Sequence, residues 1–289
     1  MDYFERIQNA IEFIEENLQE EIEIVEVASK AFFSPFHFQR LFQAISGFSV
    51  QEYIRKRRLS EATLLLKKTN KNILEIAISY QYNSQEAFTR AFKSYFDITP
   101  AAYRKSNINV NKQNKINFLD YRRNIKGEIN MNKPDIVILN KINIVGYEYK
   151  TNLNDYKYFK DIPEFYDDFG KNSYYLQIPQ RSKPGISYGI ACNFQDNGEF
   201  SFIVGEESDA SSENINDKFV GFQIPEGKYA EFKICGSVDL VQNTRRYIYS
   251  NWLPNSNYER REGPDFEITD VCNSIFPNNM NMKIYIPIK

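Results

Sequence analysis

Histidine, cysteine and glycine are scarce in this chain, which has 1, 3 and 12 of them among its 289 residues. The single histidine, His37, removes histidine-based metal sites and most acid–base catalysis from consideration. Cys192, Cys235 and Cys272 form no Cys-x-x-Cys pair, which is typical of buried thiols in a reducing cytoplasm. Gly-rich phosphate loops, nucleophile elbows and metal-ligand clusters are also missing. The sequence therefore predicts a protein that is not an enzyme and holds no metal or cofactor.

The chain also lacks an apolar run long enough to span a bilayer, and its first residues are acidic rather than those of a signal peptide. We therefore expect a cytoplasmic protein without membrane contact. Its length favours two domains. Residues 1–108 carry no net charge, residues 109–133 carry +4 and residues 134–289 carry −6. The compact basic cluster Arg55-Lys-Arg-Arg58 lies in the first part, whereas the acidic last part is not suited to contact phosphate.

The first hundred residues contain one pattern twice, offset by fifty positions. The first copy reads Ser34-Pro-Phe-His-Phe-Gln-Arg-Leu-Phe42 and the second reads Ser84-Gln-Glu-Ala-Phe-Thr-Arg-Ala-Phe92. Each copy has a serine that can cap a helix, apolar residues at helical spacing and an arginine on another face. The pattern predicts two short helices that present polar side chains. Two such helices in one chain can read successive segments of a DNA major groove.

Capping residues and apolar spacing predict that residues 1–106 are helical throughout. Ser49-x-x-Glu52 and Asn72-x-x-Glu75 both match the capping box. The long helix that starts after Ser49 would hold the two reading helices about 34 Å apart, one turn of DNA. Residues 107–133 are rich in asparagine and lysine, which predicts a linker, with a short helix near residues 118–123.

The polar positions of the two short helices are the candidate base contacts. Glutamine pairs well with adenine, arginine with guanine, and glutamate can accept from cytosine N4. The alternative is a helical bundle in which the repeat only builds a core, and Phe38 and Phe88 are better explained in that way. Packing does not require matching polar positions on both helices, however, so the repeat favours DNA contact. The candidates are Phe36, Gln39 and Arg40 in the first helix and Gln85, Glu86, Thr89 and Arg90 in the second.

From residue 134 the apolar period shifts toward two, which predicts strands. The order strand–helix–strand–strand occurs twice, with helices predicted over residues 155–169 and 238–252. Two such units can pair into one antiparallel sheet with both helices on one face, leaving a concave surface at the junction. The predicted fold is therefore an all-α N-terminal domain followed by an α+β domain.

One carboxylate of this half occupies a suggestive position. In Gly263-Pro-Asp-Phe-Glu267-Ile-Thr, strand alternation sends Glu267 to the face opposite Phe266 and Ile268. If those two residues pack under the helices, Glu267 points into the concavity, where a buried carboxylate ringed by aromatics favours a hydrophobic cation. The alternative is a glutamate on a solvated sheet face, with the aromatic residues in the core. The candidate aromatic contacts are Tyr147, Tyr149, Tyr229, Trp252 and Tyr285.

Residues 6–105 resemble the double helix-turn-helix DNA-binding domain of the AraC/XylS family of transcription regulators. The most specific stretch is Ser84-Gln-Glu-Ala-Phe-Thr-Arg-Ala-Phe-Lys-Ser-Tyr-Phe96, followed by Thr99-Pro-Ala-Ala-Tyr-Arg104. The resemblance implies that both short helices contact bases of promoter DNA and that RNA polymerase is a partner. The family usually has glycine in each turn, where this chain has Phe32 and Gln81. Because glycine adopts positive φ cheaply, we expect these turns to be strained or differently shaped.

Residues 134–289 resemble the GyrI-like effector-binding domain. The match rests on Ile224-Pro-Glu-Gly-Lys-Tyr-Ala-Glu-Phe232, on Asn251-Trp-Leu-Pro254 with Gly263-Pro-Asp-Phe-Glu267, and on Ile284-Tyr-Ile-Pro287. In ligand-sensing members of that family a glutamate on the corresponding strand binds lipophilic cations, and Glu267 matches that position.

Together these patterns predict a DNA-binding domain at residues 1–106, a linker at 107–133 and an effector-binding domain at 134–289. The predicted function is a transcription activator that senses an amphipathic, cationic small molecule. Because the two reading helices differ in their polar residues, we expect a non-palindromic operator read by a single chain. Two alternatives stay open for the second half: a protein-interaction or inhibitor-like domain that binds no ligand, or a small-molecule hydrolase.

Overall fold

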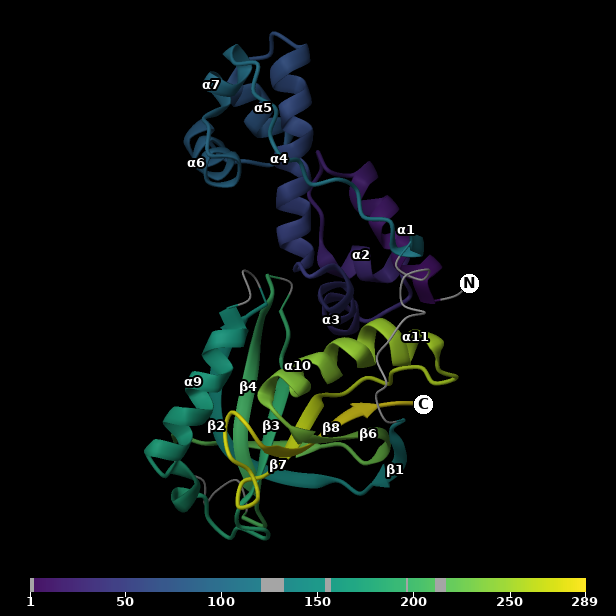
Figure 1. The fold of residues 1–289 in the computed structure, drawn as a ribbon, viewed down its shortest axis with the longest axis vertical. Helices are drawn as coiled ribbons and strands as arrows, with labels where there is room; N and C mark the ends of the chain where they lie inside the picture. The colour runs from purple at the N-terminus through teal and green to yellow at the C-terminus, as the bar shows by residue number, and fades with distance from the viewer. Residues whose placement is uncertain (1–2, 121–132, 154–156, 196, 211–216) are drawn as a thin grey trace. The chain divides into compact units, whose positions relative to one another are not determined.

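The computed structural model describes residues 3–120, 133–153, 157–195, 197–210 and 217–289. The chain divides into two compact units, Met1–Asn124 and Ile125–Lys289 (Figure 1). Each unit has its own hydrophobic core. Residues 3–105 of unit 1 consist of helices joined by short turns, as the sequence predicts. Its helices are α1 (Tyr3–Glu16), α2 (Ile24–Lys30), α3 (Pro35–Ser46), α4 (Val50–Lys68), α5 (Ile73–Ser79), α6 (Gln85–Phe96) and α7 (Pro100–Lys105).

Two helix-turn-helix units share the long helix α4 (Figure 1). Helices α2 and α3 form the first, and α5 and α6 form the second. The predicted caps are present: Ser34 accepts from the backbone N–H of His37, and Ser84 from that of Ala87. Asn72 and Glu75 form the predicted capping box, since each side chain accepts from the backbone N–H of the other. At Ser49, by contrast, only the serine half of the box is recorded, and Glu52 pairs with Lys56.

Residues 109–118, part of the predicted linker, pack along the helices of unit 1, and we call them the strap. The Gln113 N–H donates to Ser60 Oγ at 2.9 Å and the Ile116 N–H to Tyr53 Oη at 3.2 Å, both on α4. The Phe118 N–H donates to Gln8 Oε1 of α1 at 2.8 Å, and the Phe118 side chain is fully buried. Residues 118–120 are helical, and the rest of the helix predicted near residues 118–123 lies outside the described residues.

Unit 2 contains one eight-stranded antiparallel sheet with the order β1-β6-β8-β7-β3-β4-β2-β5. The two predicted strand–helix–strand–strand units are present, and they join where β3 pairs with β7. This confirms the predicted fold class; β5 and a short 3-10 helix, η2 (Tyr174–Gln177), were not predicted. The strands are β1 (Asp135–Leu139), β2 (Ile142–Asn152), β3 (Ile186–Cys192), β4 (Glu199–Glu207), β5 (Val220–Ile224), β6 (Gly227–Gly236), β7 (Asp265–Asp270) and β8 (Met280–Pro287).

Two long helical segments cover one face of this sheet. Helix α9 (Lys157–Lys171) lies over β2 and β4 (Figure 1). Helix α10 (Val238–Tyr247) contacts β6 and continues through a π-helical segment, η4 (Ile248–Trp252), into α11 (Leu253–Asn255). The helix predicted over residues 238–252 is therefore present, but its last five residues have π-helical rather than α-helical hydrogen bonds.

The other face of the sheet encloses a second cluster of buried side chains. This cluster takes residues from β1 and β5, the two edge strands, as well as from the centre, so the sheet curls around it. Phe266 and Ile268 belong to this cluster, so the condition stated above, that these two residues pack under the helices, is not met, and Glu267 lies on the helix-covered face instead. Cysteine burial was also predicted incorrectly: Cys192 is buried and burial raises the pKa of its thiol to about 12, but Cys235 and Cys272 are exposed.

Candidate functional site

The second reading helix, α6, separates its apolar and polar residues cleanly. Phe88, Phe92 and Phe96 are buried, and they pack against α4 and α7 residues in one core. On the other side, Gln85, Glu86 and Arg90 are exposed and Thr89 is half-buried. The carboxylate of Glu86 accepts from its own backbone N–H and from Ser84, and these bonds hold its pKa below the usual value. All four predicted contact residues of α6 therefore lie outside the core.

The first reading helix, α3, has the same pattern of buried apolar side chains. Phe38, Leu41 and Phe42 are fully buried. Of the predicted contact residues, Phe36 and Arg40 are half-buried and lie one helical turn apart, with the Arg40 guanidinium carbon 5.8 Å from the centre of the Phe36 ring. Gln39 is buried in the structure. The base-contact roles of these residues stay predictions.

Both turns that precede the reading helices have a non-glycine residue in the left-handed region. The φ angles are +55° at Phe32 and +64° at Gln81, as expected from the missing glycines. A polar contact from α1 or its C-terminal end fixes each turn. Arg6 donates to the carbonyl oxygens of Ala31 and Phe32, and the Gln81 amide donates to the carbonyl oxygen of Gln19. These contacts hold each turn in a conformation that costs a non-glycine residue backbone strain.

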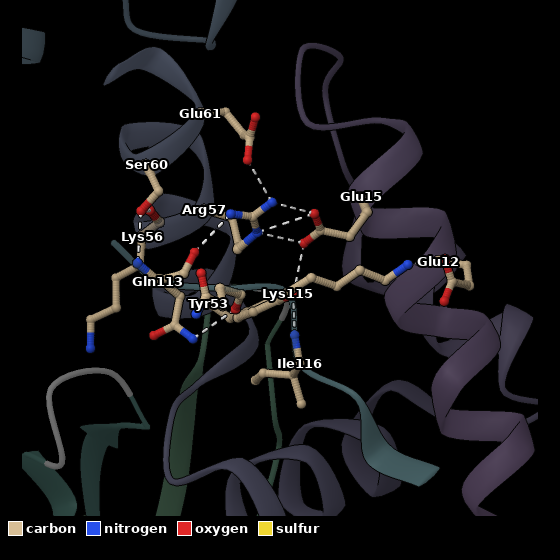
Figure 2. Close-up of polar contacts among 11 residues, drawn as sticks. Glu12, Glu15, Tyr53, Lys56, Arg57, Ser60, Glu61, Gln113, Lys115 and Ile116 are labelled. Atoms are coloured by element: carbon tan, nitrogen blue, oxygen red, sulfur yellow. Dashed lines mark hydrogen bonds and ion pairs between the residues drawn. The ribbon is translucent and has the colours of Figure 1, made fainter. Parts of the chain in front are cut away.

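The basic cluster 55–58 includes two arginines that hold unit 1 together, and Figure 2 shows the contacts of one of them, Arg57. Arg57 pairs with Glu15 of α1 at 2.7 Å and with Glu61 at 2.8 Å, and it donates to the Gln113 carbonyl of the strap at 2.7 Å. Burial alone would lower the pKa of Arg57, but the bonds and charges of the two glutamates raise it instead. Arg58 donates to the Leu18 and Glu20 carbonyls. These two guanidiniums are therefore engaged inside the unit rather than held ready for phosphate.

Glu267 faces the helices of unit 2, on the central strand β7. It is 3% exposed, and the Tyr166 hydroxyl of α9 donates to its Oε1 at 2.8 Å. Its Oε2 forms an ion pair with Arg245 of α10. Burial and the Glu267 charge together raise the pKa of Tyr166 well above its usual value, so the hydroxyl stays a donor. The alternative of a glutamate on a solvated sheet face is thereby excluded.

A glycine makes room for this arrangement. Gly189 of β3 lies opposite Glu267 in the antiparallel register. A Cβ atom at this position would come within 2.0 Å of the Tyr166 hydroxyl and 2.9 Å of Glu267 Oε1. Any larger residue would therefore push the tyrosine and the glutamate apart.

Three of the five predicted aromatic contacts share the helix-covered face with Glu267, and two do not. Tyr147 and Tyr149 stack on Phe165 of α9, with ring centres 6.1 and 5.2 Å apart. Phe232 and Glu267 both pair with Ile284 of β8, so their side chains lie on the same face of the sheet. Trp252 packs against Phe232 and therefore lies on this face too.

Tyr229 and Tyr285 pack on Phe266 in the cluster on the opposite face. The sheet therefore separates them from Glu267, and the proposed site does not include them. Sequence reasoning missed Tyr166 and Arg245, because nothing in the spacing of a chain with 20 tyrosines singles out Tyr166. Arg245 lies in the last turn of an amphipathic helix, where the helix dipole favours a cation, so its presence there did not indicate a role beside Glu267.

Comparison with known proteins agrees with both units. Residues 135–288 match the integron-associated effector binding protein family, and residues 27–106 match a helix-turn-helix domain family. The chain belongs to the AraC/XylS family and carries a GyrI-like effector-binding domain. It is a DNA-binding transcription regulator.

The regulator is similar along its whole length to the right origin-binding protein of Escherichia coli K12, with 28% identity over an alignment of 305 positions that covers 100% of both chains. The transposon Tn10 TetD protein of Escherichia coli is 43% identical over 102 residues, which are 35% of this chain and 74% of TetD. An integron cassette protein of Vibrio cholerae has a similar structure, with 19% identity, a TM-score of 0.40, and coverage of 55% of this chain and 97% of that protein.

The described residues contain no group of three or more histidine, cysteine, aspartate or glutamate side chains that could hold a metal ion. Within the same residues, no helix has the length and apolar character that crossing a membrane requires.

Proposed function

We propose that the regulator activates transcription in the cytoplasm by reading an asymmetric promoter element through α3 and α6 and recruiting RNA polymerase. The support is the arrangement of α6, where Gln85, Glu86 and Arg90 are exposed on the side away from the core. The corresponding polar residues of α3 differ in kind, so the two half-sites should differ in sequence.

Replacement of Arg90 or Arg40 by alanine tests this reading. Each change should cost roughly 1–3 kcal/mol of binding free energy on the specific site and relax the base preference at one position. Lys228→Ala, an exposed lysine in unit 2, is the control for a general loss of positive charge. Titration of a labelled promoter fragment at fixed salt measures the affinities. Unchanged affinity and base preference in both arginine variants would contradict the assignment.

We further propose that unit 2 senses an amphipathic small molecule that carries a positive charge, with Glu267 as its counter-ion. The observation that carries this proposal is the buried carboxylate itself, which sits under α9 and α10 with Tyr166 and Arg245 as its partners. A buried charge is costly, and a binding site for a cation is a good reason to keep one.

Binding of tetraphenylphosphonium to the full chain tests the effector proposal. Trp252, the single tryptophan, lies on the same face as Glu267 and reports binding by its fluorescence. We expect saturable binding that is lost in Glu267→Gln and is absent for neutral triphenylphosphine oxide. If the cation binds Glu267→Gln as well as the original chain, Glu267 is not the counter-ion.

A further inference from the structure

Strand β7 carries two buried carboxylates that are equipped in the same way. Asp265 and Glu267 are two residues apart, so they point to the same face of the sheet. Each receives a tyrosine hydroxyl and a guanidinium. Tyr249 and Arg260 serve Asp265, and Tyr166 and Arg245 serve Glu267. The two groups have the same composition and therefore allow a direct comparison of their surroundings.

The Asp265 group is sealed. The Arg260 side chain is 1% exposed and that of Asp265 is 4% exposed. Arg260 comes from the loop just before β7, and it also donates to the carbonyl oxygens of Arg261 and Gly263 at 3.0 and 2.6 Å. A guanidinium with this many fixed acceptors cannot leave without breaking the loop. The Asp265 group is therefore a structural clamp.

The Glu267 group is open on one side. The Arg245 side chain is 29% exposed, although the carboxylate that it pairs with is buried. Among the described residues, Glu267 is the acceptor recorded for this guanidinium. Arg245 also comes from a different element, the last turn of α10, directly before the π-helical segment. A rotation of one long side chain would free Glu267 without disturbing any other hydrogen bond of Arg245.

We propose that Arg245 is a built-in competitor of the cationic effector. Its guanidinium occupies the counter-ion position on Glu267, and the effector binds by displacing it toward solvent. This inference rests on the effector function proposed for Glu267. It adds that the affinity of the site is set by exchange of one cation for another, so the carboxylate never stands unpaired in the protein interior.

The test is the affinity of the full chain for tetraphenylphosphonium after Arg245→Gln. Glutamine at this position of α10 is shorter than arginine and carries no charge, so we expect binding about tenfold tighter than in the original chain. Arg245→Lys keeps the charge and should stay near the original affinity. Arg246→Gln, an exposed neighbour on the same helix, should also leave the affinity unchanged.

Arg260→Gln is the matched structural variant. It should lower the unfolding temperature without tightening binding, and the unfolding temperature of Arg245→Gln shows whether that chain is folded. If the original chain binds through Glu267 and Arg245→Gln binds equally or more weakly, the competitor role is wrong while the effector function stands. If neither chain binds the cation, and Glu267→Gln behaves like both, the proposed effector function and this inference fail together.

Discussion

The two helix-turn-helix units of unit 1 have matching frameworks but complete their cores in different ways. In each, an arginine binds carbonyl oxygens at the end of the helix that precedes the unit. For the first unit this helix is α1, and Arg58 donates to the Leu18 and Glu20 carbonyls that follow it. In the same manner, Arg104 donates to the Leu66 and Lys71 carbonyls at the end of α4. The arginine always comes from the helix that follows the reading helix.

The difference lies in what covers the reading helix from behind. The second unit closes its core with α7, where Tyr103 packs on Phe92 with ring centres 5.7 Å apart. In the first unit the strap helps to cover the reading helix, and the centre of its Phe118 ring is 5.6 Å from that of Phe42 on α3. The two copies therefore differ in what the strap contributes to them: the first takes in the fully buried Phe118, whereas the second is contacted by the partly buried Val110.

The largest expected effect is that of Phe118→Ala. Removal of a fully buried phenylalanine costs about 3–5 kcal/mol, and here the loss should fall on the first unit alone. Hydrogen exchange of the full chain should show faster exchange in α1 and α3, with α6 protected as before. Val110→Ala is the control, since Val110 is only partly buried and packs on the second core. Equal loss of protection in α3 and α6 would show that the two units are one cooperative core.

A slightly smaller loss is expected from Arg57→Ala. The change leaves the half-buried carboxylate of Glu15 without the guanidinium of the buried Arg57, and breaking a buried pair in this way costs about 3 kcal/mol. Chemical unfolding of the full chain measures the loss. The double variant Arg57→Met with Glu15→Leu should recover most of it, because no charge is then left unpaired. A double variant no more stable than Arg57→Ala would argue against the ion pair as the cause.

The two turns should respond in the opposite direction. Phe32→Gly relieves positive φ at an exposed side chain, while the Phe32 carbonyl keeps its bond from Arg6, so we expect a gain of about 1 kcal/mol. Gln81→Gly should gain less, because the amide bond to the Gln19 carbonyl is lost. Thermal unfolding compares the two. A loss of stability in Phe32→Gly would mean that its ring contributes more than the backbone strain costs.

The smallest expected effect is that of acid, which should weaken the contact between the strap and α1. The bond from Lys115 holds the pKa of Glu12 below 4.5, so this contact stabilises the folded chain above pH 4.5 and is lost as pH falls through the lowered value. Both side chains are largely exposed, which keeps the effect small. The amide exchange of Ile116 reports it. Lys115→Gln should remove the pH step, and a step that persists would point to another carboxylate.

Local signals in the sequence are sufficient for the helices, the caps and the paired strand–helix–strand–strand units, because each depends on residues close together in the chain. Contacts made by isolated residues over long distances leave no such signal. Phe118 lies in a stretch dominated by asparagine and lysine, so its burial against α3 could not be predicted. For Glu267, alternation gave the correct side of the strand but not which side the helices cover. The partners Tyr166 and Arg245 come from two separate helices, and only the fold brings them together.

The strap also determines where the DNA-binding domain can be joined to something else. The stretch that matches the helix-turn-helix family, residues 27–106, leaves out α1, Ile116 and Phe118. A recombination event that exchanged the effector-binding domain at residue 106 would also remove the strap residues that complete the first helix-turn-helix unit. A junction beyond residue 118 would instead transfer a complete DNA-binding domain. The workable site for domain shuffling therefore lies 12 residues after the end of the stretch that matches the helix-turn-helix family.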